Sequence, residues 1–259
     1  MRRLVVDLPP SRAALWSGRL ALFACCVVAI AVLLARLDRI DLAPALAVLG
    51  TGLAMALAAV ALAVSAFFVI WADGRPGFSG AMGGLLLAAV LMVWPCVLAV
   101  QALRLPRLSD VSTDVVDPPS FSRSRKALEA RGGATPPEVA REQRQQQQQA
   151  YPGVAPILLD FTPQETYALA LKAAQQRGWQ IIETAQPGGR TGIGRIEAID
   201  RSLVMRFPSD VTVRVRPLAT GARVDVRSAS RRWSHDFGEN ARRVQNYAQA
   251  LLDLAEAKD

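Results

Sequence analysis

The chain divides near Arg104 into an apolar part and a polar part. Three long apolar runs come first, Leu20–Ala35, Leu42–Ala72 and Pro76–Leu103. A membrane-spanning helix needs about 20 predominantly apolar residues. The second and third runs reach that length, and the first reaches it when Leu15–Gly18 extends it and the Arg19 side chain extends to the membrane interface. The pattern therefore predicts three membrane-spanning helices.

The arginines around these runs predict an orientation. Arginines 2, 3, 12 and 19 precede the first run, whereas the two loops that follow carry two and one. Cytoplasmic segments are enriched in Lys and Arg. We therefore expect a bacterial inner-membrane protein with a cytoplasmic N-terminus and a periplasmic C-terminal domain, although Arg104 and Arg107 favour the reverse. A cleaved signal peptide is the alternative for the first run, but the second run follows at once, which favours an uncleaved helix.

No ionisable residue interrupts the centres of the apolar runs. Ion and proton pathways usually place such a residue at membrane depth, so the pattern argues against a transporter. Alanine and glycine are frequent, and Gly80 and Gly84 have the small-xxx-small spacing of close helix contacts. We prefer packing of the three helices with one another, and docking onto a partner membrane protein is the alternative.

The polar part begins with a predicted linker. Prolines 106, 118 and 119 break helices in residues 105–124, and residues 123–150 are polar, basic and of low complexity, ending in the run Gln145–Gln149. The sequence therefore predicts a three-helix transmembrane region (1–104), an extended linker (105–150) and a soluble domain (151–259).

The soluble domain carries local signals for helices and strands. Thr162 and Glu165 form a capping box with Pro163 at the first helical position, which predicts a helix to about Gln176. Strands are expected at about 180–185, 191–200 and 203–207, followed by a hairpin and an amphipathic helix at about 239–257. This order predicts a small α+β domain with an antiparallel sheet and helices on one face.

The hairpin has the clearest pattern. Valines at 211, 213, 215, 224 and 226 alternate with polar residues on either side of a four-residue loop, Leu218–Gly221. This loop pairs Val215 with Val224 and sets Arg214 opposite Asp225. Alternation predicts one buried and one exposed face, so the charged pair is expected to be exposed and worth a few tenths of a kcal/mol.

Charge and cysteine content exclude several function classes. The formal net charge of +8 divides evenly, so residues 105–259 carry only +4 with mixed signs. Binding to a phosphate backbone needs a denser basic stripe, so we expect no nucleic-acid partner. All three cysteines lie in the apolar runs, which leaves the soluble part without a disulfide framework or a thiolate metal site. We expect no metal and no cofactor.

One stretch, residues 227–243, concentrates polar chemistry between the last strand and the last helix. Its candidate ligand-binding residues are Arg227, Ser228, Ser230, Arg231, Asp236, Asn240 and Arg243. Guanidinium groups beside a helix N-terminus can bind phosphate or carboxylate. The alternative is structural: Asp236 and Ser234 cap the helix, and the arginines pair with Asp210, Asp225 or Glu197.

Three functions remain open at this point. The first is an envelope protein whose periplasmic domain binds a partner protein or an anionic ligand through residues 227–243. The second is a hydrolase-like enzyme that uses Ser230, His235 and Asp236, although the sequence shows no nucleophile, base and orienting group in a recognisable arrangement. The third is an accessory subunit that acts through its membrane helices.

Several passages carry a resemblance to a known family. They are Val111–Phe121, Ile196–Ala198, Arg206–Val211, Arg214–Arg216, Val224–Arg231 and Asp236–Arg243. Together they resemble the domain-of-unknown-function family 1499 of bacteria and plant plastids, over roughly Arg107–Leu254. Ser209 and the Arg232–Trp233 pair depart from the expected pattern. The resemblance implies short N-terminal membrane helices with one soluble domain, and it implies no activity.

Overall fold

A computed structural model describes residues 9–231 and 234–258. The chain separates into two compact units, Met1–Val100 and Gln101–Asp259. Arg2 and Arg3, which carry part of the predicted orientation, and the Arg232–Trp233 pair lie outside the described residues.

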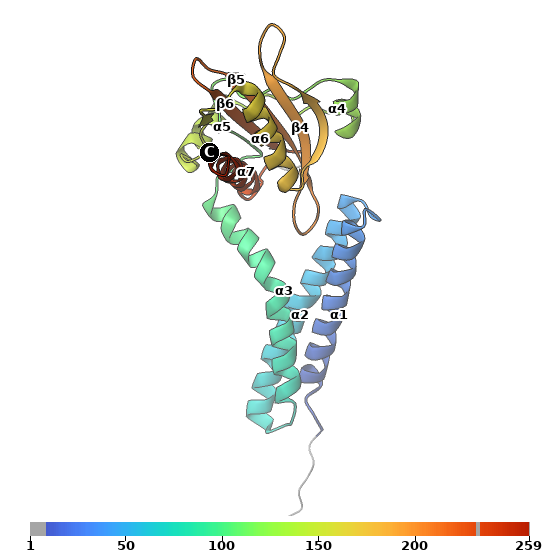
Figure 1. The fold of residues 1–259 in the computed structure, drawn as a ribbon. Helices are drawn as coiled ribbons and strands as arrows, with labels where there is room; N and C mark the ends of the chain where they lie inside the picture. Colours follow the sequence, from blue (N-terminus) through green and yellow to red (C-terminus); the bar gives the residue numbers. More distant parts are fainter. Residues whose placement is uncertain (1–8, 232–233, 259) are drawn as a thin grey trace, which may run out of the picture. The chain divides into compact units, whose positions relative to one another are not determined.

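Three long helices confirm the prediction from the apolar runs (Figure 1). They are α1 (Arg12–Arg36), α2 (Leu42–Asp73) and α3 (Phe78–Arg104). Each is long and apolar enough to cross a membrane. The first helix extends well beyond its apolar run and includes Arg19.

Small residues form the contacts between these helices. Ala21 and Ala24 of α1, Ala56 and Ala59 of α2 and Ala88 of α3 are fully buried in one cluster. Gly80 and Gly84 face α1, and a Cβ added at Gly84 would lie 2.7 Å from the carbonyl carbon of Ser17. Large apolar side chains such as Phe68 and Trp71 are exposed instead. The small-residue spacing therefore serves contact within this unit, and the outer surface suits lipid.

The second unit is built on one antiparallel sheet with the order β1-β6-β5-β4-β3, and β2 also pairs with β6. The strands are β1 (Asp110–Ser112), β2 (Ile157–Leu159), β3 (Gln180–Ala185), β4 (Gly194–Arg201), β5 (Pro208–Pro217) and β6 (Ala222–Ser230). Its helices are α4 (Arg125–Ala130), α5 (Arg141–Ala150), α6 (Pro163–Gln176) and α7 (Glu239–Glu256). The α+β class with an antiparallel sheet is thus confirmed.

The core lies between the sheet and two helices, α6 and α7, which cross one of its faces (Figure 1). The five hairpin valines are at most 1% exposed, and Tyr247 of α7 stacks on Trp179 at 4.7 Å between ring centroids. The predicted capping box is present, with the Thr162 and Glu165 side chains each bonded to the other residue's backbone N–H. The predicted pairings of Val215 with Val224 and of Arg214 with Asp225 are also confirmed.

The strand predicted at 203–207 is wrong. The Ser202 N–H donates to the Phe207 carbonyl at 2.9 Å, and the Ser202 hydroxyl accepts from the Phe207 N–H at 2.9 Å, so the two residues close a turn. Arg206 has a φ of 54°, which an extended strand does not allow. Strand β4 therefore turns directly into β5, and four strands separate α6 from α7 instead of five.

The second face of the hairpin differs from the prediction. Arg214 is 8% exposed and Asp225 is fully buried, although alternation predicted an exposed pair. The reason is residues 113–150, here called the covering segment, whose side chains and carbonyls bond to this face. The region predicted as a linker thus contributes a strand, two helices and many of the bonds that bury the polar face.

Gln147 explains how part of this segment is held. Its side-chain Oε1 accepts from the Ser112 backbone N–H at 3.0 Å, and its Nε2 donates to the Ser112 carbonyl at 2.6 Å. The amide therefore pairs with β1 as a neighbouring strand would, at a position where a strand edge would otherwise lie open. Gln147 is 4% exposed, whereas its neighbours in the glutamine run are exposed.

Candidate functional site

Buried ion pairs dominate the polar face of the sheet. Arg131 of the covering segment, whose side chain is fully buried, pairs with Glu197 of β4 and lies 3.5 Å from Asp210 of β5. Glu197 also accepts from the Thr212 hydroxyl at 3.0 Å and from the Ser122 N–H at 2.9 Å. Burial raises the pKa of Glu197 above its ordinary value, although Arg131 and these hydrogen bonds lower it. We therefore interpret Glu197, a buried carboxylate with several donors, as a structural residue of the sheet.

A second network lies further along the hairpin. Its members are three arginines and three aspartates: Arg214, Arg216, Arg223, Asp114, Asp117 and Asp225. Partial burial raises the pKa of Asp114, but the Asp117 N–H and the Arg223 guanidinium bring it below its ordinary value. These charges balance one another, which leaves this region no evident surplus to attract a ligand.

Arg227, the first predicted ligand-binding residue, is 5% exposed and points into the polar face. Its Nε and Nη2 donate to the Asp110 carboxylate at 2.8–3.1 Å. Further bonds run to the carbonyls of Pro119 and Pro137. Its guanidinium lies over the Phe121 ring, 4.9 Å from the centroid. This arginine therefore already has a carboxylate partner.

Four more predicted residues, Ser228, Ser230, Asn240 and Arg243, form one hydrogen-bonded cluster. The Ser228 hydroxyl donates to the Asn240 Oδ1 at 2.7 Å, and Arg243 donates to both of them. Arg243 also donates to the Asp200 carboxylate at 2.5 Å. Asn240 donates in turn to the Ser230 hydroxyl oxygen at 2.9 Å. The cluster links β6 and β4 to α7, and its donors are directed at protein acceptors.

Arg231 and Asp236 likewise find partners inside the protein. Arg231 donates to both oxygens of Asp210 at 2.9–3.2 Å. Asp236 accepts from the backbone N–H groups of Gly238 and Asn240, at 2.9 and 2.7 Å, so it satisfies two free donors at the start of α7. Burial raises the pKa of Asp236 even though these bonds lower it. These contacts match the structural alternative from the sequence.

His235 does not complete a catalytic relay within the described residues. Its Nδ1 accepts from the Phe237 N–H at 3.1 Å, and its Nε2 is buried without a partner. No hydrogen bond joins it to Ser230 or Asp236 in the described part of the chain. The residues of the enzyme hypothesis are therefore near one another in sequence but are not connected as nucleophile, base and orienting group.

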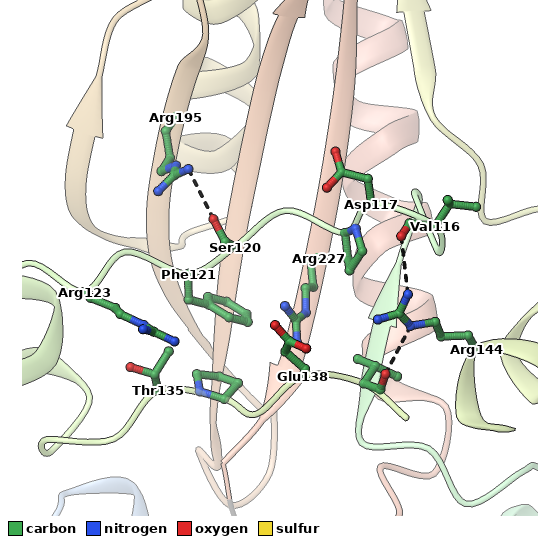
Figure 2. Close-up of a pocket in the computed structure, with 13 residues that line it drawn as sticks. Val116, Asp117, Ser120, Phe121, Arg123, Thr135, Glu138, Arg144, Arg195 and Arg227 are labelled. Atoms are coloured by element: carbon green, nitrogen blue, oxygen red, sulfur yellow. Dashed lines mark hydrogen bonds between the residues drawn. The ribbon is translucent and has the colours of Figure 1, made fainter. Parts of the chain in front are cut away.

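A cavity of about 600 Å³, here called the groove, lies between the covering segment and the sheet (Figure 2). It is lined by Val116, Asp117, Pro118, Ser120, Phe121, Arg123, Thr135, Pro136, Glu138, Val139, Arg144, Arg195 and Arg227. Eleven of these residues belong to the covering segment, one to β4 and one to β6. Of the residues predicted for ligand binding, only Arg227 lies here.

Three groove arginines differ from those of the networks. Among the described residues, the Arg195 side chain donates only to the Ser120 hydroxyl, at 3.4 Å, and the Arg144 side chain donates only to backbone carbonyls. Neither these two nor Arg123 forms an ion pair with a carboxylate in the described residues. The sequence offered no signal that separates them from paired arginines, since all lie in mixed-charge segments.

The comparison with protein families agrees with the sequence resemblance. The family model described as a protein of unknown function, DUF1499, matches residues 110–251. This range begins at β1 and ends within α7, so it includes the groove and both ion networks and leaves out α1–α3. The search of curated proteins finds no match.

Proposed function

The chain belongs to the DUF1499 family of proteins of unknown function, and from this premise we propose that it is a membrane-anchored protein whose C-terminal unit binds an anionic ligand in the groove. The observation that carries the proposal is the set of three groove arginines, Arg123, Arg144 and Arg195, that lack a carboxylate partner in the described residues. Guanidinium groups without a carboxylate partner at a cavity favour phosphate or carboxylate ligands.

The proposed site includes Arg227 and otherwise lies outside residues 227–243. The internal bonds of Arg231, Asp236 and Arg243 leave these groups little capacity for a ligand. The groove has both volume and unmatched charge. The lining carboxylates are Asp117, which pairs with Arg214 and Arg216, and the exposed Glu138. The four lining arginines outnumber them, although Arg195 also lowers the pKa of Glu183 and Glu197 through its charge, without an ion pair to either.

The proposed location follows the arginine distribution of the sequence. The helices cross the bacterial inner membrane with the N-terminus in the cytoplasm, which leaves the groove in the periplasm. A C-terminal tag on the full chain tests this: a membrane-impermeant reagent should label it in intact spheroplasts. Labelling that appears only after lysis would place the C-terminus in the cytoplasm and overturn the orientation.

Anion binding is tested on the full chain in a zwitterionic detergent. Inorganic phosphate should raise the melting temperature of the C-terminal unit above that in chloride of equal ionic strength. Arg195→Gln should reduce the shift. Arg177→Gln removes an exposed arginine at the end of α6, on the opposite face of the sheet, and should not. Equal shifts in both variants would show that phosphate acts outside the groove.

A further inference from the structure

We propose that the groove binds an elongated ligand with two phosphate-class groups joined by an uncharged bridge. The inference rests on the proposed function, because it assigns a ligand class to the same groove. It follows from where the unmatched charges lie: positive charge at two ends of the groove and negative charge between them (Figure 2).

Two arginines and two hydroxyls form the first end. Arg123 and Arg195 lie on one side of Phe121, together with Ser120 and Thr135 (Figure 2). The Ser120 hydroxyl oxygen accepts from Arg195, so its own proton can be donated to a ligand. Arg195 and Ser120 offer N–H and O–H donors in one part of this end, and Arg123 and Thr135 offer them in another. A phosphate group has three terminal oxygens, so it can accept more of these donors than the two oxygens of a carboxylate can.

Arg144 forms the second end, on the opposite side of Phe121 (Figure 2). Its Nε donates to the Val139 carbonyl at 3.1 Å, and its Nη1 donates to the carbonyls of Val115 and Val116 at 3.3 Å. These bonds hold the guanidinium in place without neutralising its charge. The remaining donors of Arg144 are available to a second anionic group.

The middle of the groove disfavours an anion. Arg227 lies there, but Asp110 already pairs with it. Glu138 lies between the two ends in the view of Figure 2 and has no ion pair among the described residues. Phe121 and Pro136 add apolar surface to the lining of the groove. A compact polyanion would meet the Glu138 carboxylate, whereas an uncharged bridge between two separated phosphates would not.

Bisphosphonates of increasing length measure the distance between the two phosphate-binding positions. Methylene-, propane-1,3-, butane-1,4- and hexane-1,6-bisphosphonate carry similar charge at different separations, and methylphosphonate supplies a single group. On the full chain in zwitterionic detergent, affinity should peak at one of the longer lengths, about tenfold or more above methylphosphonate. Arg144→Gln should lower the affinity for that bisphosphonate to within about threefold of the affinity for methylphosphonate. Arg177→Gln should leave the length that binds most tightly unchanged.

Glu138→Gln gives a second test that does not depend on the bonds of Arg144. Glu138 is exposed, and removing its charge should strengthen binding of methylene-bisphosphonate more than binding of the best long one. Affinity that is independent of length, together with no effect of Arg144→Gln or Glu138→Gln, would overturn the two-anion proposal and leave anion binding intact. If neither methylphosphonate nor any bisphosphonate distinguishes wild type from Arg195→Gln, the proposed function itself is wrong.

The two phosphates can belong to a lipid head group or to a soluble molecule. Nanodiscs of phosphatidylcholine with and without cardiolipin, whose head group has two bridged phosphates, separate these sources. Competition by cardiolipin against the best bisphosphonate supports a lipid ligand. Undiminished bisphosphonate affinity in the cardiolipin discs supports a soluble ligand of the same chemistry.

Discussion

Replacing Arg131 by methionine measures how much the buried ion network stabilises the second unit. The Arg131 side chain is fully buried, and those of its partners Glu197 and Asp210 are 1% and 2% exposed. Removing one partner of a buried pair leaves an uncompensated charge, so we expect a loss of about 3–5 kcal/mol. The Arg125–Glu129 pair on α4, the helix that ends just before Arg131, is mostly exposed. Arg125→Met is therefore the matched control, with a loss below about 0.5 kcal/mol.

The free energy of unfolding is measured on the full chain in detergent, by pulse proteolysis in urea. Arg131→Met combined with Glu197→Gln should recover part of the loss, because the amide carries no charge that needs a partner. Equal losses for Arg131→Met and Arg125→Met would refute the reasoning, since burial would then make no difference to the value of an ion pair.

The same variant has an expected pH dependence. Burial already raises the pKa of Glu197 above its ordinary value of 4.5, and Arg131 lowers it. Removing Arg131 should raise it further. A carboxyl whose pKa is raised by folding contributes stability below its unfolded pKa, and this contribution is lost as pH rises through the folded pKa. The loss caused by Arg131→Met should therefore be smaller at about pH 5 than at about pH 8. A constant loss across that range would contradict this cause.

Three further predictions each compare a substitution with a control substitution in the same protein. Gln147→Ala removes two hydrogen bonds to β1 and should cost about 2 kcal/mol in urea unfolding, whereas Gln148→Ala, at an exposed position, should cost less than about 0.5 kcal/mol. Asp236→Ala removes the acceptor for two N–H groups at the start of α7 and should cost about 1–2 kcal/mol, and Asp236→Asn, which keeps an acceptor, should cost less. Gly84→Val places a side chain against α1 and should lower the melting temperature of the helical unit in detergent, whereas Gly83→Val, with open space around it, should not.

The parts of the fold that follow from sequence are those with local causes. The apolar runs predict the three helices because length and composition decide membrane crossing. The Thr162 capping box and the valine alternation predict α6 and the register of β5 with β6 because their partners are a few residues away. The sequence does not predict the turn at Ser202–Phe207, because the apolar residues there have the pattern of a short strand and only the bond between the Ser202 and Phe207 backbones excludes it.

The burial of the polar face could not be read from alternation. A period of two places Arg214 and Asp225 on the same face, but it does not say whether water or protein covers that face. The protein that covers it comes from about 100 residues earlier, where Asp114 and Asp117 approach Arg214. Low complexity and frequent prolines made that region resemble a linker. Its order depends on long-range bonds that a sequence pattern does not contain.

The density of charged residues along the chain indicates residues 227–243 as a binding site, whereas the arginines without an ion pair among the described residues indicate the groove. Residues 227–243 contain the densest cluster of polar groups, yet Arg231 and Arg243 have carboxylate partners at 2.9 and 2.5 Å. Nothing in the sequence distinguishes Arg195, and its only side-chain hydrogen bond within the described residues is the long contact with Ser120. A guanidinium that is bonded to a carboxylate must lose that bond before it binds an anion, whereas the structure gives Arg195 no carboxylate bond in the part of the chain that it describes. We therefore expect an added anion to bind more favourably in the groove than at residues 227–243.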